Sequence, residues 1–357
     1  MYKKIKIAHF ITTSGLYGAE MWVLGLLRYL KKVDALLICP NTSDISLLKE
    51  ANKLGIKTHL LKVKGNFVFF DFVNKLSELL KREKIDILHT HSYKSNLIGY
   101  FAAKKTGLKI ISTPHGWSFN AGLKLRIYES IDRFFLRFFD LIVPLSKGLR
   151  NSLKHINKNK IKVINNFVDL DLIPKPKKGN LKLITFIGQL IERKRVQDLI
   201  FALKYVQDKK VKLQIIGNGS KKKKLISLTK KFVLDHRVKF FGFRKDRLEL
   251  LNNSEILVLP SLLEGIPRVI MEAMAMKRII IGTDIPGIRE LIKNKKNGLL
   301  VPIKSPKKIA EAINWIWQNK KQTQKISKEA RALIEKKFSA ERAASEYSKI
   351  YKKIINL

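Results

Sequence analysis

The feature that most constrains the fold is an alternation of short apolar strands and amphipathic helices, which runs through the chain twice. Between the strands of the first half, apolar residues recur three and four positions apart, as in Met21–Leu30 and Phe72–Leu80. Such alternation predicts a parallel sheet with helices on both faces. The predicted strands of this half are Lys6–Ile11, Ala35–Cys39, Thr58–Leu61, Ile85–His89, Lys109–Thr113, Leu141–Val143 and Lys162–Ile164.

The alternation breaks once, at residues 174–180, where a short, polar, proline-bearing stretch predicts an interdomain linker. It then restarts, with helices near 196–207, 220–231, 245–252 and 267–276. We therefore predict one doubly wound domain at 1–173, a second at 181–338, and a C-terminal helix within 339–357 that returns to the first domain. The strands expected in the second domain are Leu181–Ile187, Lys212–Ile216, Val238–Phe240, Ile256–Leu259 and Ile279–Ile281.

Several classes of protein are excluded by composition. The single cysteine, Cys39, rules out an intramolecular disulfide framework and a zinc site built from cysteines, and it fits a reducing cytoplasm. No apolar run approaches the roughly 20 residues that a membrane span needs. The first residues lead directly into a strand pattern and lack the apolar core of a signal peptide. We therefore expect a cytoplasmic protein.

The charge is unusual, because 72 Lys and Arg against 29 Asp and Glu give a net charge of +43. Both halves of the chain are basic. An even lysine excess on solvated faces is one explanation; an anionic membrane surface, anionic substrates or nucleic acid are the others. We expect no nucleic-acid partner, since the sequence contains no helix-turn-helix, zinc-finger or RNA-binding sheet motif.

The most specific motif spans residues 260–274, with the sequence PSLLEGIPRVIMEAM. A buried strand ends there, and Pro267 suits the first turn of the helix that follows. The free N–H groups at such a helix start form an anion site. Glu264 lies in the loop, and Glu272 lies about two helical turns into the helix. Two carboxylates beside a phosphate site suit the recognition of sugar hydroxyls, although both could instead be ordinary charged positions.

This segment resembles the Glu-x7-Glu motif of the family-4 retaining glycosyltransferases. The resemblance extends along nearly the whole chain, in order. It includes residues 17–20, 89–91, 113–116 and 165–169 in the first half, and 188–194, 217–219, 241–242, 284–290 and 297–299 in the second. It implies the α/β GT-B fold, in which two doubly wound, Rossmann-like domains face each other across a cleft, the first binding acceptor and the second binding the nucleotide sugar.

The resemblance also implies roles for individual residues. Glu264 would bind hydroxyls of the donor sugar, Glu272 the ribose hydroxyls, and Phe243 would lie beside the base. His115 would lie near the transferred sugar and Lys194 would neutralise the departing diphosphate, so that His115, Glu264 and Lys194 are the catalytic candidates. The diphosphate would contact the segment Ile266, Pro267, Arg268 and Val269.

Glycines follow several predicted strands. Gly18 lies in the loop after the first strand, and Gly217 and Gly219 follow a strand of the second domain. Glycine lets backbone approach a phosphate closely, but such glycines are also common in ordinary turns. With the resemblance, Gly18 is a predicted diphosphate contact, and Gly217 and Gly219 are predicted to adjoin the nucleotide.

The sequence departs from the family pattern at Gln189, where the family has an arginine that clamps phosphate beside Lys194. Glutamine carries no charge, and the charge-assisted hydrogen bond that it forgoes is worth about 1.5–3 kcal/mol. Arg193, Arg195 and Arg268 are the candidates to replace it. We include Gln189 among the predicted nucleotide-binding residues.

No metal site is predicted. His89 and His91 share one face of a strand, but no third ligand is evident. Asp169 and Asp171 match an Asp-x-Asp metal motif only in their letters, and by the resemblance Asp169 belongs to a structural turn. Enzymes with the GT-B fold generally use cationic side chains and helix dipoles to neutralise the leaving nucleotide.

Lys124–Asp140 interleaves basic and aromatic residues, and its aromatic side chains either rest on an anionic bilayer or face the core. We expect them to face the core. Phe72–Lys84 is a second candidate surface helix.

Together these features predict a retaining glycosyltransferase that moves a hexosyl or N-acetylhexosaminyl group to a hydroxyl of a glycan or lipid-linked acceptor in cell-surface polysaccharide synthesis. The donor would be a nucleotide diphosphate sugar, with UDP favoured over GDP, and no further cofactor is expected. The enzyme would act in the cytoplasm, at the inner face of the plasma membrane. The alternatives are another GT-B nucleotide-sugar enzyme, such as an epimerase, and a basic polyanion-binding protein.

Overall fold

The computed structural model describes residues 4–13, 15–16, 18–63, 69–116 and 123–356. Tyr17, the first residue of a predicted motif, lies outside them. The chain forms two compact units, which are described separately: Met1–Phe167 with Ala340–Leu357, and Val168–Ser339. The first unit thus ends at Phe167 rather than at residue 173, and the stretch predicted as a linker, 174–180, groups with the second unit.

The first unit contains a six-stranded sheet in the order β3-β2-β1-β4-β5-β6, with every neighbouring pair parallel. Its strands are β1 (Lys6–Phe10), β2 (Asp34–Pro40), β3 (Lys57–Leu61), β4 (Ile87–Thr90), β5 (Lys109–Ser112) and β6 (Leu141–Ile142). The strand predicted at Lys162–Ile164 is wrong. Only Ile161 bridges to Ile142 there, because the edge strand β6 is two residues long.

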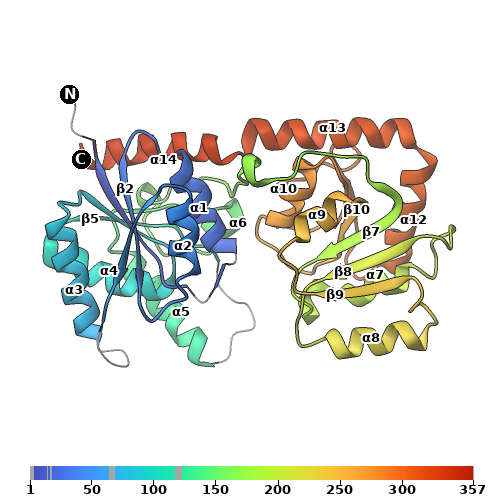
Figure 1. Ribbon diagram of the computed structural model, residues 1–357, viewed down its shortest axis with the longest axis horizontal. Helices are drawn as coiled ribbons and strands as arrows, with labels where there is room; N and C mark the ends of the chain where they lie inside the picture. Colours follow the sequence, from blue (N-terminus) through green and yellow to red (C-terminus); the bar gives the residue numbers. More distant parts are fainter. Residues whose placement is uncertain (1–3, 14, 17, 64–68, 117–122, 357) are drawn as a thin grey trace. The chain divides into compact units, whose positions relative to one another are not determined.

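Helices cover both faces of this sheet (Figure 1). One face packs against α1 (Gly18–Tyr29), α2 (Ser46–Lys53) and α14 (Ala340–Ile355); the other packs against α3 (Phe69–Arg82), α4 (Tyr93–Thr106) and α5 (Leu123–Leu136). The short helix α6 (Lys147–Asn151) and two 3-10 turns, Lys158–Lys160 and Leu170–Leu172, complete the connections before β7. Since both faces are covered, the central strand β1 buries Ile7 towards one layer and Ala8 towards the other.

The second unit repeats the architecture, with sheet order β12-β11-β10-β7-β8-β9. Its strands are β7 (Asn180–Ile187), β8 (Lys212–Ile216), β9 (Val238–Gly242), β10 (Ser254–Leu259), β11 (Ile279–Thr283) and β12 (Leu299–Val301). Its helices are the 3-10 turn Glu192–Lys194, α7 (Val196–Ala202), α8 (Lys222–Lys231), α9 (Arg247–Asn252), α10 (Arg268–Ala275), α11 (Pro286–Arg289), α12 (Pro306–Gln318) and α13 (Lys320–Lys337).

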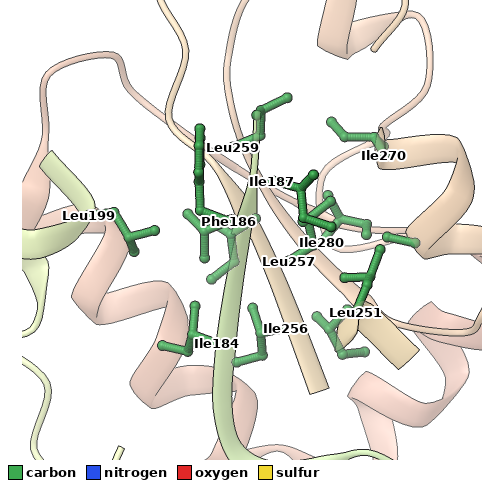
Figure 2. Close-up of a cluster of buried hydrophobic side chains, with 14 of the residues drawn as sticks. Ile184, Phe186, Ile187, Leu199, Leu251, Ile256, Leu257, Leu259, Ile270 and Ile280 are labelled. Carbon is green, nitrogen blue, oxygen red and sulfur yellow. The ribbon is translucent and has the colours of Figure 1, made fainter. Parts of the chain in front are cut away.

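The core of the second unit lies on both sides of this sheet. Figure 2 shows Leu199 of α7 on one side of the strands and Leu251 of α9 and Ile270 of α10 on the other. All three side chains are completely buried. This packing fixes α9 and α10, from which the charged residues described below project.

The last helix, α14, lies along α1 in the first unit (Figure 1) and carries two buried tyrosines to the sheet. Their hydroxyls enter one chain of hydrogen bonds that crosses three strands. The chain runs through Tyr347, Thr113, His89, Tyr351, His9 and His91, with successive distances of 2.9, 2.9, 2.8, 3.5 and 2.9 Å. The C-terminal helix is therefore tied to the carboxyl ends of β1, β4 and β5 by polar contacts as well as by packing.

One direction of donation satisfies this chain best. If the Tyr347 hydroxyl donates to Thr113 and each later group donates onward, every buried donor in the chain has an acceptor except Nδ1–H of His91, which has no partner in the structure. In the opposite direction two groups would be unpaired: the hydroxyl proton of Tyr347 would lack an acceptor, and Nδ1 of His91 would lack a donor. Because an unpaired buried polar group costs about 1–3 kcal/mol, the first direction is favoured.

Burial makes these histidines neutral. It lowers the pKa of His9 to about 3 and holds the pKa of His89 and His91 well below the usual value of 6.5. The unfolded chain therefore binds protons below about pH 6.5 that the folded chain does not bind. Stability is fully present above that pH and is lost as the pH falls towards 3.

We expect acidification from pH 7.5 to 5.5 to lower the free energy of unfolding by about 1.4 kcal/mol for each of these histidines. In His89→Gln the amide retains a donor and an acceptor but does not titrate. The loss of unfolding free energy between pH 7.5 and 5.5 should therefore be smaller by about 1.4 kcal/mol, the contribution of one histidine. Urea unfolding at a series of pH values measures this. The exposed His236→Gln is the control and should follow the wild-type curve; a wild-type slope in His89→Gln would contradict the explanation.

Candidate active site

The candidate site in the second unit is built where loops follow β7 and β10. Lys194 ends the 3-10 turn after β7, and Glu264 lies in the loop after β10. Lys194 Nζ lies 2.5 Å from Glu264 Oε1, and both side chains are mostly buried. The two loops are joined by their backbones, since Leu262 N donates to the Arg193 carbonyl at 2.8 Å. The predicted pair Lys194 and Glu264 is thus brought into direct contact.

Glu272 lies inside α10 and is only 1% exposed. Arg247, the first residue of α9, donates to both of its carboxylate oxygens, at 2.6 and 2.9 Å, and Arg268 Nε donates to Oε1 at 2.9 Å. Burial acts to raise the pKa of Glu272, but the two guanidinium groups outweigh it and the pKa is lowered. Glu272 is therefore a carboxylate at neutral pH, held in one orientation.

The three arginines considered as replacements for the missing arginine at Gln189 are in different situations. Arg195 forms two hydrogen bonds with Asp198, at 3.0 and 2.7 Å, and a third with Glu192. Arg193 donates to the Leu263 carbonyl. Arg268 uses Nε for Glu272, while its Nη1 is buried and has no hydrogen-bond partner in the structure. Arg268 thus retains one buried N–H group for which no described residue supplies an acceptor.

The glycines of the second unit are explained by close packing of neighbouring loops. A Cβ atom at Gly217 would lie 1.9 Å from the Gly188 carbonyl oxygen, and one at Gly219 would lie 2.4 Å from the Leu190 carbonyl oxygen. The loops that follow β7 and β8 therefore fit together only because these residues are glycine. Gln189, on the first of these loops, is exposed.

Phe243 follows the end of β9 and is 63% exposed. Its ring therefore offers an uncovered aromatic face of the kind on which a nucleobase stacks. Ile266 and Pro267, which precede α10, are buried, whereas the side chains of Arg268 and Val269 are partly buried. Of these four side chains, only that of Arg268 carries a charge that an anion could meet.

The remaining predicted residues belong to the first unit. Gly18 begins α1, and a Cβ atom there would meet nothing within 4 Å. His115 follows β5; its ring packs edge-on against Trp22, with 5.1 Å between the ring centroids, and its Nε2 has no hydrogen-bond partner among the described residues. Burial lowers the pKa of His115 to about 3, so the ring is neutral.

Two groups of residues were missed by the sequence analysis. Arg247 lies 25 positions before Glu272, and no local pattern links them. His9 joins His89 and His91 to give three imidazoles, each with a nitrogen within 4.8 Å of the others, which is the composition of a metal site. However, both ring nitrogens of His89 already have partners, Tyr351 and Thr113, so the group is arranged as a hydrogen-bonded network.

Two family models match the chain. The model described as Glycosyl transferases group 1 matches residues 170–333, and the model described as Glycosyltransferase Family 4 matches residues 17–172. Their boundary lies close to the division between the two structural units.

Relatives of known name are similar over most of their length. One from Escherichia coli, named UDP-Gal:alpha-D-GlcNAc-diphosphoundecaprenol alpha-1,3-galactosyltransferase, is 28% identical over 330 residues, or 85% of each chain. A second, from Campylobacter jejuni, is N,N'-diacetylbacillosaminyl-diphospho-undecaprenol alpha-1,3-N-acetylgalactosaminyltransferase; it is 26% identical and covers 97% of this chain and 98% of its own. A capsular polysaccharide biosynthesis glycosyltransferase of Staphylococcus aureus, CapH, is 24% identical and covers 89% of this chain and 92% of its own.

Solved structures agree in fold. Anabaena HepE in complex with UDP superposes with a TM-score of 0.85 at 18% identity, covering 98% of this chain and 100% of that one. Sucrose-phosphate synthase from Thermosynechococcus elongatus gives a TM-score of 0.80 at 17% identity, covering 99% and 100%. The same HepE protein was also crystallised with UDP-glucose.

Two parallel six-stranded sheets with flanking helices, together with these neighbours, define a two-domain α/β protein of the GT-B fold. The chain belongs to the group 1 glycosyltransferases and is a transferase enzyme. Among its described helices, none combines the length and the apolar character needed to cross a membrane.

Gly287→Ala tests how the Glu264 loop is held. A Cβ atom at Gly287, on α11, would lie 2.2 Å from the Glu264 carbonyl oxygen and 2.0 Å from that of Gly265, so the loop must move. We expect a loss of about 1–3 kcal/mol in unfolding free energy and a lower kcat for glycosyl transfer. Gly148→Ala, whose nearest contact would be 3.7 Å, is the control. Wild-type stability and kcat in Gly287→Ala would show that the loop is not fixed by this contact.

Proposed function

We propose that this enzyme transfers a hexosyl or N-acetylhexosaminyl group, with retention of anomeric configuration, from a UDP-sugar to a hydroxyl of a lipid-linked or glycan acceptor. The observation that carries the proposal is the cluster in the second unit, where Lys194, Glu264, Arg268 and Glu272 lie on adjoining loops and helix starts. The named relatives act on undecaprenol-linked glycans or in capsule synthesis, and a structural neighbour binds UDP and UDP-glucose.

The second unit would bind the donor. The carboxylate of Glu272 has about four lone-pair sites, of which Arg247 and Arg268 occupy three, so one remains to accept from a ribose hydroxyl. Phe243 would stack on the base. The diphosphate would lie at the start of α10, against Ile266–Val269, with Gly217 and Gly219 adjoining it.

We further propose that Arg268 supplies the charge that Gln189 lacks. Its guanidinium, on a side chain that is 16% exposed, would donate to a diphosphate oxygen while Nε continues to hold Glu272. Lys194 would share its charge between Glu264 and the diphosphate. Charge that develops on the leaving group would thus be stabilised by fixed cations.

The first unit would bind the acceptor. Gly18 remains a proposed diphosphate contact, and His115 is proposed to lie near the transferred sugar. In the proposed step the acceptor hydroxyl attacks the anomeric carbon on the face from which the diphosphate departs. The bond from the anomeric carbon to the diphosphate oxygen breaks, the bond to the acceptor oxygen forms, and that diphosphate oxygen takes the acceptor proton. Glu264 would hold the sugar by its hydroxyls, and neutral His115 would contact it without adding charge. No further cofactor takes part in the step.

We place the reaction in cell-surface polysaccharide synthesis, at the cytoplasmic face of the plasma membrane. Support comes from the diphosphoundecaprenol acceptors in the names of two relatives and from the net charge of +43. The epimerase and polyanion-binding alternatives are not favoured by the comparisons, in which the named relatives are glycosyltransferases.

A thermal-shift comparison of UDP, GDP and a short oligonucleotide tests the donor assignment. UDP at 100 times its Kd should stabilise the protein by about 2.7 kcal/mol, and GDP and the oligonucleotide should do so much less. Glu272→Gln, which keeps the shape but loses the charge, should abolish the UDP effect. The exposed Glu329→Gln is the matched control. Equal shifts from every polyanion, unchanged in Glu272→Gln, would refute the site.

Arg268→Gln separates phosphate binding from ribose binding. Loss of a charge-assisted hydrogen bond worth about 1.5–3 kcal/mol should weaken UDP by roughly 10- to 100-fold. Uridine, which has no phosphate, should be weakened much less, because Arg247 still holds both oxygens of Glu272. Arg193→Gln is the control and should bind both ligands normally. Isothermal titration of uridine and UDP gives the comparison; equal weakening of both ligands would show that Arg268 acts only by orienting Glu272.

A further inference from the structure

One face of α5 leaves large apolar side chains uncovered. Ile127, Ile131 and Phe134 follow one another at intervals of four and three residues, which places them on a single side of the helix. Phe138 follows two residues beyond the end of α5, and each of the four side chains is 37–52% exposed. Our expectation that the aromatic side chains of this segment face the core is therefore wrong for Phe134 and Phe138. It holds for Phe139, which is completely buried.

The exposed row continues over the neighbouring helices through ring contacts. Phe134 contacts Phe135 at 5.5 Å between ring centroids, Phe135 contacts Phe101 of α4 at 5.5 Å, and Phe101 contacts Phe69 of α3 at 5.4 Å. The row ends at Phe70, which is 74% exposed, the largest exposed fraction among the apolar side chains described. The three helices on this side of the first sheet (Figure 1) are therefore linked by one row of ring contacts that is exposed at its two ends.

Cations border this surface, and the acids of α5 are withdrawn from it; Asp71, next to Phe70, is 30% exposed and is paired with Lys75. Lys104 and Lys105, in the last turn of α4, and Arg137 are exposed, and the Arg137 guanidinium lies 4.5 Å from the centre of the Phe134 ring. Glu129 and Asp132, the acidic residues of α5, are buried. The exposed charge on this side of α5 is thus positive.

A hollow of about 460 Å³ opens between α3 and α4 beside the aromatic row. It is lined by Phe69, Phe70, Val73, Phe101, Lys104 and Lys105. Its floor is apolar and its rim carries two ammonium groups, a combination that matches an acyl chain beneath a phosphate headgroup.

We propose that this aromatic–basic face, made of Phe70, Lys104, Lys105, Ile127, Ile131, Phe134, Arg137 and Phe138, docks the first unit on the surface of an anionic phospholipid bilayer. The aromatic and aliphatic side chains enter the boundary between headgroups and acyl chains, and the cations bind lipid phosphates. The inference deepens the proposed function, because it specifies how an enzyme with a lipid-linked acceptor reaches the membrane.

The competing occupant is a second copy of this chain. Pairing two such faces would bring Lys104, Lys105 and Arg137 of each copy towards the same cations of the other, and like charges at an interface cost free energy. An anionic bilayer supplies the opposite charge over the same area. Charge complementarity therefore selects the bilayer.

Co-sedimentation with vesicles of phosphatidylcholine and phosphatidylglycerol tests the proposal without any transferase assay. Binding should require phosphatidylglycerol and fall as salt is added. Phe134→Ser with Phe138→Ser should weaken binding at least tenfold. Lys104→Gln, Lys105→Gln and Arg137→Gln together should weaken it on the order of 100-fold, at about 1 kcal/mol per cation.

Matched control variants lie on the second unit. Val233→Ser with Ile303→Ser removes two exposed apolar side chains, and Lys321→Gln, Lys325→Gln and Lys328→Gln remove three exposed cations from α13. Both controls should bind vesicles like the wild type. If the controls lose as much binding as the face variants, general charge rather than this face is responsible, and the proposal is overturned.

A fluorescent label reports the orientation directly. Cys39 is completely buried, and burial raises the pKa of its thiol to about 12, so it does not compete for a thiol-reactive dye. An environment-sensitive dye on Ser130→Cys, an exposed position beside Ile131 and one turn before Phe134, should shift to the blue on phosphatidylglycerol vesicles. A dye on Lys321→Cys should not. A shift at Lys321→Cys alone would overturn the proposal.

The outcomes separate this proposal from the proposed function. UDP binding by the face variants should equal that of the wild type, because the face lies in the first unit and the UDP site in the second. Vesicle binding without UDP binding would support the docking face and refute the donor site. UDP binding without vesicle binding, or a dimer that the Phe134→Ser, Phe138→Ser variant dissolves, would refute the docking face alone.

Discussion

A buried carboxylate is the constraint on which the second unit depends. Glu272 is removed from water inside α10, and its charge is retained only because Arg247 and Arg268 surround it. Removing one partner of such a group typically costs 3–5 kcal/mol, because the remaining charge is left uncompensated. The contact joins the first residue of α9 to the interior of α10. The same interaction that fixes these helices therefore also fixes the polar end of the proposed nucleotide site.

Much of the fold could be predicted from the sequence, because hydrophobic periodicity is a local property. The alternation located β1 to β11, and the C-terminal helix predicted within 339–357 is α14, Ala340–Ile355. The failures are at sheet edges. The three-residue strand β12 was missed, and Lys162–Ile164 was predicted as a strand although a two-residue edge strand offers it little to pair with. Short edge segments carry too few residues for a periodic signal.

The site was predictable only in part, for a different physical reason. Glu264 and Glu272 lie in one loop and in the helix that directly follows it, so a sequence motif reveals their spacing. The partners of these carboxylates, Lys194 and Arg247, come from other elements, and only the folded sheet brings Arg247 to Glu272. Likewise, α5 is apolar on more than one side, and its sequence does not say which side the neighbouring helices cover.

The hydrogen-bonded chain from α14 also bears on the order in which the molecule can form during synthesis. The second unit is one continuous segment, so all of it is synthesised before residues 340–355. The first unit is discontinuous, and until those residues emerge, Trp22 and the histidines beneath it lack the layer that Tyr347 and Tyr351 supply. The half of the protein that is translated first is thus completed last, and a ribosome that stalls near residue 339 leaves an apolar sheet face open to other chains.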